Sequence, residues 1–384
     1  MIALAFISSL LLLAYAALII YYHKGWKSLP ELIPHTTNAA GQPNPNIKVT
    51  VIIPARNEAA AIRQCIESYL QQDYPPHLRE CIVVDDFSED ATADIVREYA
   101  KNGVQLVELR AILSPRHINS YKKKAIETGI QHASGELIIT TDADCILPPQ
   151  WISEHVRYQQ QNGLMLVAAP VRIHPVNSWL AQFQALDFLS LQGITGASHS
   201  RGLHAMCNGA NLSYTKAAFT AVNGFAGVDD LASGDDMFLM QKITARFPGK
   251  TGYLKSRAAI VDTAPMPSWR EFFRQRIRWA SKARAYTEWS IQLVLALVYM
   301  VNLLLLGILI ATIFFPEYWW CSVGLLLIKI LIEWPFMFSV GRFFGLGKLV
   351  IIFPLFQPAH IIYTVIAGTF GQFGSYQWKG REVR

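Results

Sequence analysis

The stretch "LIITTDADCI", residues 137–146, changes character halfway along its length. Its first four residues are typical of a strand that is buried on both faces of a sheet. Asp142 and Asp144 follow at alternate positions, and in an extended chain such residues point to the same side. Two adjacent carboxylates repel each other, so their placement at the end of a buried strand calls for a physical reason.

The segment around this stretch, about residues 46–267, alternates between short β-branched runs and helical patterns. Helical patterns are predicted at 57–72, from near Asp90, and at about 122–133. The predicted strands are "KVTVIIP" (48–54), "ECIVVDD" (80–86), "VQLVEL" (104–109), "GELIITT" (135–141) and "LMLVAAPVRI" (164–173). This rhythm predicts the α/β class, with a mostly parallel, Rossmann-like sheet covered by helices on both faces.

Acidic side chains follow two of the predicted strands, at the edge where open α/β sheets bind ligands. Asp85 and Asp86 close one strand, and Asp142 and Asp144 close another. A divalent metal would remove the repulsion between these carboxylates, and hard metal ions prefer oxygen ligands and often share phosphates with a nucleotide. Capping of turns at the surface is the structural alternative for each acid.

Four long apolar runs indicate membrane segments. Residues 2–22 contain no charge, and further runs lie at about 290–315, 321–340 and 349–370. Each is long enough to cross a bilayer as a helix. The first is predicted to be an uncleaved anchor, with a cleaved signal peptide as the alternative. The last contains Pro354 and Pro358, so a kinked or re-entrant segment is possible.

Basic residues near the ends of these runs predict the orientation. His23, Lys24 and Lys27 follow the first run, and Arg342 and Lys348 separate the last two, which places both loops and the α/β domain in the cytoplasm. The basic tail "WKGREVR" would then lie outside if all four runs cross, against the same rule. The sequence leaves this conflict open.

Composition narrows the function classes. The chain has 384 residues, 52% of them hydrophobic, and a net charge of +6. The basic residues cluster beside membrane segments rather than among aromatic residues in a soluble groove, which argues against a nucleic-acid partner. Five scattered cysteines predict neither a zinc site nor a disulfide framework. Asp187, in an otherwise apolar helical pattern, has no explanation in the sequence.

Four motifs in order carry a family resemblance. They are "VIIPARNE" (51–58), "VVDDFSED" (83–90), "TTDADC" (140–145), and "GDD" (234–236) followed by "QRIRW" (275–279). Across about residues 48–285 the chain resembles the membrane-anchored family 2 glycosyltransferases of GT-A fold. That group includes ceramide glucosyltransferases and the hyaluronan, chitin, cellulose and poly-N-acetylglucosamine synthases.

The resemblance implies a nucleotide-sugar site. Pro54, Ala55, Asn57 and Glu58 match the segment that contacts the nucleoside, and Asp86 matches the acid that hydrogen-bonds the uracil edge. A uridine diphosphate sugar is therefore the expected donor.

The resemblance also implies a diphosphate and metal site. Lys122 is expected near the diphosphate, although "YKKKA" leaves Lys123 as an alternative. Asp142 would face the ribose or the metal, and Asp144 would bind Mg²⁺ or Mn²⁺ directly.

The GDD and Q-x-x-R-W segments match the catalytic and acceptor side of the family site. Asp236 corresponds to the general base, with Asp235 as its neighbour or as a metal contact, and Gly209 lies in a loop expected near the donor sugar. Gln275, Arg278 and Trp279 form the Q-x-x-R-W motif, expected at the acceptor and diphosphate. A membrane-interface anchor is the alternative for Trp279.

The expected function is inverting transfer of a sugar to a membrane lipid at the cytoplasmic face of a multi-pass membrane protein. A processive exopolysaccharide synthase subunit that extends a glycan, and a catalytically inactive scaffold, are the alternatives. The predicted domains are an anchor (1–23), a linker (24–47), the GT-A domain (48–267), an amphipathic interface helix (268–287), a membrane region (288–371) and a basic tail (372–384).

Overall fold

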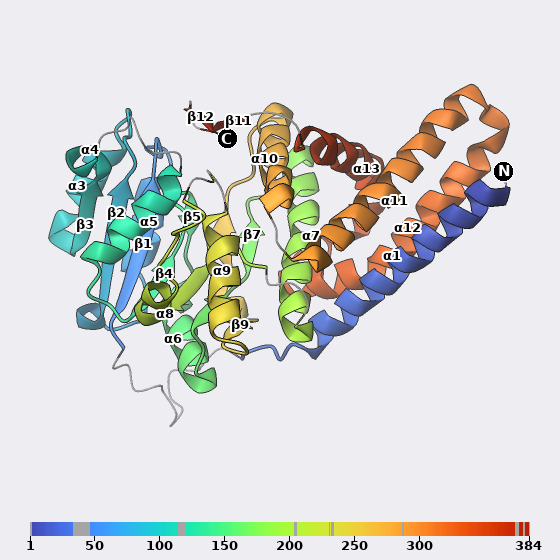
Figure 1. The fold of residues 1–384 in the computed structure, drawn as a ribbon. Helices are drawn as coiled ribbons and strands as arrows, with labels where there is room; N and C mark the ends of the chain where they lie inside the picture. Colours follow the sequence, from blue (N-terminus) through green and yellow to red (C-terminus); the bar gives the residue numbers. More distant parts are fainter. Residues whose placement is uncertain are drawn as a thin grey trace. The chain divides into compact units, whose positions relative to one another are not determined.

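The chain divides into two compact units. The computed structural model describes residues 2–33, 47–113, 120–202, 206–229, 231, 234–285, 288–372, 376–378 and 381–383 (Figure 1). The sheet unit consists of Pro30–His174, Ala205–Ala264 and Gln377–Arg384, and the helical unit consists of Met1–Leu29, Pro175–His204 and Pro265–Tyr376. Residues 34–46 of the predicted linker and residues 373–375, 379–380 and 384 of the predicted tail lie outside the described residues.

A seven-stranded sheet forms the core of the sheet unit. Its order is β3-β2-β1-β4-β8-β6-β9. The strands are β1 (Val49–Ala55), β2 (Arg79–Asp85), β3 (Val104–Glu108), β4 (Leu137–Thr140), β6 (Leu166–Ala168), β8 (Leu212–Thr215) and β9 (Thr251–Tyr253). Only β8 runs antiparallel to its neighbours, β4 and β6, among these strands. The mixed, mostly parallel sheet confirms the predicted α/β class.

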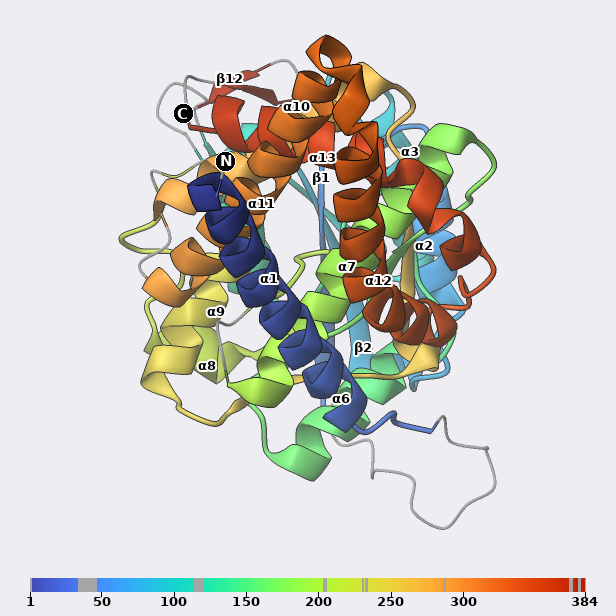
Figure 2. The same cartoon turned by 90° about the vertical axis from the view of Figure 1, so that its right-hand side faces the viewer.

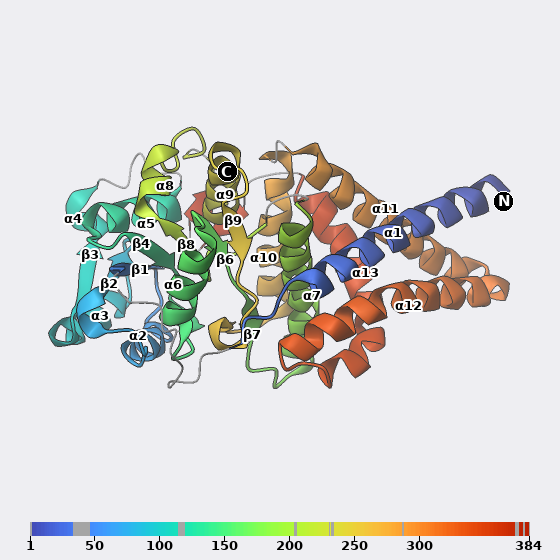
Figure 3. The same cartoon turned by 90° about the horizontal axis from the view of Figure 1, so that it is seen from below.

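Burial on both faces explains why the central strands are nearly continuous apolar runs. All four residues of β4 are buried, and Val51, Ile52 and Ile53 of β1 are fully buried. Figure 3 shows α5 and α8 on one face of the sheet and α2 and α3 on the other. The helices of this unit are α2 (Ile62–Leu70), α3 (Thr92–Glu98), α4 (Leu109–Ile112), α5 (Tyr121–His132), α6 (Trp151–Asn162), α8 (Lys216–Ala221) and α9 (Asp235–Arg246).

The single strand predicted at 164–173 is wrong. The structure has two short strands there, β6 and β7 (Val171–Ile173), which belong to different sheets. Pro170 stands between them and has no N–H for a ladder hydrogen bond, so the pairing ends at this point. β7 pairs with β10 (Val261–Thr263), which also pairs with β5 (Cys145–Ile146), in a three-stranded sheet.

Helices form the helical unit, most of them long and apolar. They are α1 (Ile2–Ser28), α7 (Trp179–Arg201), α10 (Trp269–Ser281), α11 (Trp289–Phe314), α12 (Trp319–Phe343) and α13 (Phe353–Phe370). Among them, α10 is short and carries four arginines. Figure 2 shows α1 between α11 and α12, and its Tyr22 and Trp26 are buried. The division differs from the predicted GT-A domain of 48–267, since residues 175–204, which contain α7, and residues 265–267 group with the helical unit. Residues 30–47 of the predicted linker group with the sheet unit.

Three helical segments of this unit are long and apolar enough to cross a membrane: Trp289–Phe314, Pro316–Phe343 and Leu349–Phe370. Large apolar side chains such as Ile313, Leu331 and Leu355 lie more than half exposed on their outer surfaces. Such exposure is costly in water and favourable in lipid. The N-terminal anchor stays a prediction. The remaining strands, β11 (Tyr376–Trp378) and β12 (Arg381–Val383), form a two-stranded sheet.

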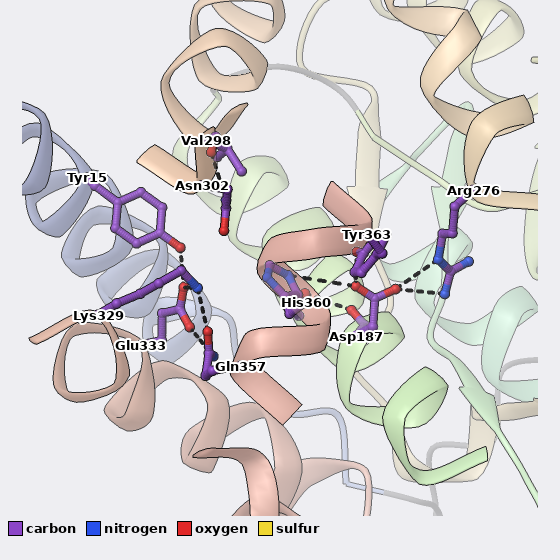
Figure 4. Close-up of polar contacts among 11 residues, drawn as sticks. Tyr15, Asp187, Arg276, Val298, Asn302, Lys329, Glu333, Gln357, His360 and Tyr363 are labelled. Carbon is purple, nitrogen blue, oxygen red and sulfur yellow. Dashed lines mark hydrogen bonds and ion pairs between the residues drawn. The ribbon is translucent and has the colours of Figure 1, made fainter. Parts of the chain in front are cut away.

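A buried polar network joins α1, α12 and α13 (Figure 4). The Lys329 ammonium lies 2.6 Å from Glu333 Oε1 and donates to Gln357 Oε1 at 2.7 Å. Gln357 Nε2 donates to Glu333 Oε2 at 2.7 Å, and the Tyr15 hydroxyl donates to Glu333 Oε1. Lys329 and Glu333 therefore neutralise each other, and each charge is compensated within an apolar helix bundle.

This network predicts a large effect for removing one charge. Glu333→Gln leaves the Lys329 ammonium buried without a counter-ion, so we expect it to cost about 3 kcal/mol or more of stability. Thermal unfolding of the detergent-solubilised protein measures the loss. The double variant Lys329→Met, Glu333→Leu removes both charges and should recover most of it. A Glu333→Gln protein as stable as the wild type would contradict this account.

Candidate active site

Two loops interlock at the carboxyl ends of β1 and β2. The buried Arg56 guanidinium donates through Nη1 to the carbonyl oxygens of Asp86 (2.9 Å) and Phe87 (2.8 Å). The Asn57 amide donates to Ser88 Oγ at 3.0 Å. These bonds hold the two loops as one rigid surface, which contains the predicted nucleoside segment and the buried Asp86.

Two non-glycine residues of these loops adopt the left-handed conformation, Asn57 with φ 51° and Phe87 with φ 53°. Asparagine tolerates this region, whereas for a bulky phenylalanine it is strained. Such strain persists only where the surrounding structure enforces it, and it concentrates at functional sites. Phe87 is held edge-on against the Tyr121 ring, 6.3 Å between centroids, at the first residue of α5.

The other predicted nucleoside contacts lie at the same strand end. Pro54 and Ala55 are the last two residues of β1 and pair with Val84 and Asp85 of β2. The Glu58 amide donates to Thr92 Oγ1 at 2.8 Å. Arg56 was not predicted as a site residue, because a charged side chain in a loop is by default solvated. Its position inside the "PARNE" motif was the available signal.

A lysine lies between the acids of two motifs. Lys122 Nζ, on α5, lies 2.7 Å from Asp142 Oδ1 after β4 and 3.3 Å from Asp235 Oδ2 at the start of α9. Burial alone would lower the pKa of Lys122, but the Asp142 and Asp235 carboxylates outweigh it and raise the pKa, so the side chain stays an ammonium. The structure thus brings together three residues that are far apart in the sequence.

Lys123, the alternative to Lys122, points elsewhere. Its Nζ donates to the carbonyl oxygens of Val228 (2.5 Å) and Leu231 (2.7 Å), and its side chain is almost fully buried. Neighbouring residues on a helix point about 100° apart, so only one of the two lysines can face the acids. The geometry favours Lys122 for the diphosphate role.

The start of α9 presents two carboxylates. Asp235 and Asp236 are its first two residues, following Gly234, which has φ 84°. The positive end of the helix dipole favours negative charge at these positions. Asp235 is nearly buried, whereas Asp236 is half-buried and accepts a hydrogen bond from the Gly209 amide through Oδ2 at 3.1 Å.

Gly209 allows the loop before β8 to approach this cluster closely. A Cβ at this position would lie 3.1 Å from Asp235 Oδ2 and 3.2 Å from Lys122 Nζ. Thr140, the last residue of β4, donates to the Gly209 carbonyl at 3.1 Å and ties the loop to the sheet. The backbone around Gly209 therefore lines the same cluster as the acids.

A buried polar network supports this loop from behind. Asn211 Nδ2 donates to the carbonyl oxygens of Pro170 (2.7 Å) and Ala259 (2.8 Å), which leaves Oδ1 as an acceptor. That oxygen receives Trp151 Nε1 at 2.8 Å and His155 Nε2 at 2.9 Å. His155 Nδ1 then accepts from Ser213 Oγ at 2.8 Å, so the ring is the neutral Nε2–H tautomer. Burial lowers the pKa of His155 to about 4.

The carboxylates suit a hard divalent metal ion whose remaining coordination positions are filled by a bound ligand. Among the residues that the structure describes, no three His, Cys, Asp or Glu side chains are grouped as a ready-made metal site. Mg²⁺ and Mn²⁺ sites that bind nucleotides need only one or two carboxylates, with water and phosphate oxygens as the other ligands. Asp142 and Asp144 lie in a turn after β4, in which the Cys145 amide donates to the Asp142 carbonyl at 3.2 Å, so they are not the extended pair that the sequence predicted. They remain the candidate carboxylates, and Asp144 Oδ2 accepts from Thr263 Oγ1 at 3.4 Å.

The Q-x-x-R-W residues belong to the helical unit. Gln275, Arg278 and Trp279 lie on α10, and the other predicted site residues belong to the sheet unit. Gln275 Oε1 accepts from Arg276 Nη1 at 2.9 Å, and the Trp279 ring lies 6.0 Å from the Phe188 ring.

Comparison with known families is consistent with this arrangement of motifs. The model named glycosyl transferase family group 2 matches residues 137–364, and glycosyl transferase family 2 matches residues 50–218. The chain belongs to the family 2 glycosyltransferases. As a family 2 glycosyltransferase, it is an enzyme that transfers glycosyl groups.

Individual relatives match parts of this glycosyltransferase. Glycosyltransferase AglE of Haloferax volcanii is 31% identical over 144 residues, 38% of this chain and 46% of the relative. Poly-beta-1,6-N-acetyl-D-glucosamine synthase of Staphylococcus epidermidis is 28% identical over 156 residues, 40% of this chain and 35% of the relative. The aligned regions thus span less than half the length of these two relatives. Shorter matches include transferases named for dolichyl-phosphate and undecaprenyl-phosphate.

One solved structure matches nearly the whole chain. It is the mannosyltransferase PcManGT of Pyrobaculum calidifontis in complex with GDP-Man and Mn²⁺. The identity is 20%, the TM-score is 0.58, and the match covers 97% of this chain and 98% of that one. The likeness shows that the two proteins share a fold, which agrees with the GT-A expectation.

The His155 network predicts a pH effect on stability. The pKa of His155 is about 4 in the folded protein and about 6.5 in an unfolded chain, so the unfolded state binds more protons between these values. Stability is therefore full above pH 6.5 and falls by roughly 3 kcal/mol as the pH drops to 4. Thermal unfolding of the full chain at pH 7 and pH 4.5 measures this. His155→Gln should show a flatter pH dependence, and parallel slopes would contradict the assignment.

Proposed function

We propose that this family 2 glycosyltransferase moves a sugar from a nucleoside diphosphate sugar, a uridine diphosphate sugar, to a membrane lipid with inversion at the anomeric carbon. The observation that carries the proposal is the cluster of Asp142, Asp235 and Asp236 around Lys122, at the carboxyl edge of the sheet. Open α/β sheets bind their ligands at this edge.

The donor would lie across the ends of β1, β2 and β4. The loop surface built by Arg56 and Asn57 would hold the nucleoside, with Asp86 as the acceptor for the base edge. Lys122 already carries a positive charge between carboxylates, and it would turn this charge toward the diphosphate when the donor binds. Gly209, which leaves room for close backbone approach, would lie beside the sugar.

A divalent ion fits beside the diphosphate. Asp144 would hold Mg²⁺ or Mn²⁺, with Asp142 as the second carboxylate and Asp235 within reach of the same charge cluster. The bound ion would offset the negative charge that develops on the leaving diphosphate. The bound Mn²⁺ of PcManGT supports this choice.

Asp236 is the proposed general base. Its half-buried carboxylate is fixed by the Gly209 amide at the start of α9 and takes the proton of the acceptor hydroxyl. The new bond forms between the acceptor oxygen and the anomeric carbon as the bond from that carbon to the diphosphate oxygen breaks. One displacement of this kind inverts the anomeric centre. Arg278 is proposed to add positive charge at the leaving group.

A lipid is the proposed acceptor, because three helical segments among the described residues are long and apolar enough to cross a membrane. Relatives named for dolichyl-phosphate and undecaprenyl-phosphate support this choice. The named poly-N-acetylglucosamine synthase supports the alternative of a growing glycan. Transfer at the cytoplasmic face of a multi-pass membrane protein is part of the proposal and follows from the basic loops.

One assay separates these alternatives. The purified chain in lipid, with Mg²⁺ or Mn²⁺, receives a panel of nucleotide sugars and a total bacterial lipid extract, and product mass is measured. A lipid that is one sugar heavier would support the proposal. A ladder of products would instead identify a polymer synthase, and donor binding without transfer would identify an inactive scaffold.

Asp236→Asn tests the general base. The amide cannot accept the proton, so we expect turnover to fall by about 10²–10⁴-fold while nucleotide binding stays unchanged. Initial rates and a nucleotide-binding isotherm measure the two effects. Asp94→Asn, at an exposed aspartate on α3, is the matched control and should behave as wild type. Turnover of Asp236→Asn near the wild-type rate would exclude the residue as base.

Asp144→Ala tests the metal site. Loss of this carboxylate should weaken metal-dependent nucleotide binding itself by about ten-fold or more, since losing even an outer-shell partner of a metal site costs roughly 10- to 100-fold in affinity. Titration of the nucleotide with and without a chelator measures the effect. Equal chelator sensitivity in the variant and the wild type would show that the ion binds elsewhere.

A further inference from the structure

Arg276 lies inside the Q-x-x-R-W motif, at one of its two unspecified positions. Its guanidinium is buried and lies over two aromatic rings of its own helix, 4.7 Å from the Phe272 centroid and 4.2 Å from the Trp279 centroid. Phe272, Arg276 and Trp279 are spaced i, i+4 and i+7, so they share one face of α10. Arg276 therefore stacks directly on the tryptophan of the motif.

Arg276 also fixes the glutamine of the motif. Its Nη1 donates to Gln275 Oε1 at 2.9 Å. A guanidinium is planar, with donors in a rigid fork, so holding one edge of it determines where the other edge points. One side chain thus orients both Gln275 and Trp279.

Asp187 holds the opposite edge of this guanidinium (Figure 4). Arg276 Nε donates to Asp187 Oδ2 at 2.9 Å, and Nη2 lies 2.7 Å from the same oxygen. The Tyr363 hydroxyl of α13 donates to Asp187 Oδ1, and His360 Nε2 lies 3.9 Å from that oxygen. Asp187 is 1% exposed and Arg276 is 4% exposed, so the pair is shielded from water.

α7 holds α10 at further points along the same side. Gln184 accepts from the Met266 amide at 2.9 Å and donates to the Met266 carbonyl at 3.0 Å, just before α10 begins. Phe188, the neighbour of Asp187, lies 6.0 Å from the Trp279 ring. The Trp279 ring therefore packs against both Arg276 and Phe188 of α7.

We propose that Arg276, held by Asp187, is a positioning residue that fixes the side chains of Gln275 and Trp279 for glycosyl transfer. The inference rests on the proposed function, since it takes the Q-x-x-R-W side chains to act in the transfer step. A buried ion pair by itself gives little net stability, which suits a role in geometry. The proposal also explains the presence of Asp187, which the sequence alone left unexplained.

Arg276→Lys is the decisive variant. Lysine keeps the positive charge near Asp187 but loses the planar stacking on Trp279 and the bond to Gln275. Misplacing a reacting group by about 1 Å costs on the order of 100-fold in rate, so we expect kcat/KM for the acceptor to fall by about 10- to 100-fold. Nucleotide affinity should stay within about two-fold of wild type, because the residues proposed to hold the nucleoside and the metal belong to the sheet unit. Arg274→Lys, at an exposed arginine of α10, is the control and should keep wild-type transfer.

A double variant separates positioning from simple loss of stability. If Arg276 acts through Trp279, Arg276→Lys with Trp279→Ala should transfer no more slowly than Trp279→Ala alone, within about three-fold. Asp187→Asn should reproduce the loss of Arg276→Lys, whereas Asp187→Glu, which keeps the charge, should restore part of it. Losses that multiply in the double variant, or that follow the fraction of unfolded protein, would overturn the inference. So would an Arg276→Lys protein that transfers within three-fold of wild type.

A readout without turnover distinguishes failure of this inference from failure of the proposed function. If wild type transfers no sugar from any donor, the proposed function fails. The packing claim is then measured by amide hydrogen exchange over residues 269–281. Faster exchange in Arg276→Lys than in Arg274→Lys supports the anchoring of α10 by Arg276, and equal exchange overturns it.

Discussion

Several carboxylates at one edge of a sheet must be balanced by positive charge, and Lys122 provides it in this enzyme. Its ammonium lies between Asp142 and Asp235, at the meeting point of three segments that are distant in the sequence. The start of α5, the turn after β4 and the start of α9 must therefore converge. Gly209 completes the arrangement because a side chain there would crowd both the lysine and Asp235. With a single ammonium among several carboxylates the cluster stays net negative, which favours a bound cation at this edge.

The helical unit obeys the same constraint in an apolar setting. Lys329 is buried against Glu333, and Arg276 against Asp187, and each acid also accepts a hydrogen bond from a tyrosine. Ionisable groups among apolar helices are expensive unless they are paired, so their presence marks places where helix geometry matters. One pair joins α1, α12 and α13, and the other holds α10 through the motif that it carries. Both pairs therefore define helix packing that apolar contacts alone would leave less specific.

Local patterns predicted much of this molecule, and long-range contacts account for the rest. The strands before Asp85 and Asp142 and the helix at 122–133 were predictable because β-branched runs and helical periodicity are local signals. The break at Pro170 was visible in the sequence, but the assignment of β7 to a second sheet depends on β10, about ninety residues later. The antiparallel strand β8 was not predicted, because the loop sequence that leads into it gives no strand signal. Motif spacing indicated the acids, whereas the partner of Asp187 is Arg276, which only the folded chain brings near.

The measurement that tests the central claim most directly is the anomeric configuration of the transferred sugar, determined by NMR on the isolated glycolipid. A single displacement with Asp236 as the base predicts a product whose configuration is opposite to that of the nucleotide-sugar donor. Retained configuration would contradict the account, because it requires either two displacements or attack from the side of the leaving group. Neither is consistent with Asp236 acting only as a proton acceptor for the attacking hydroxyl.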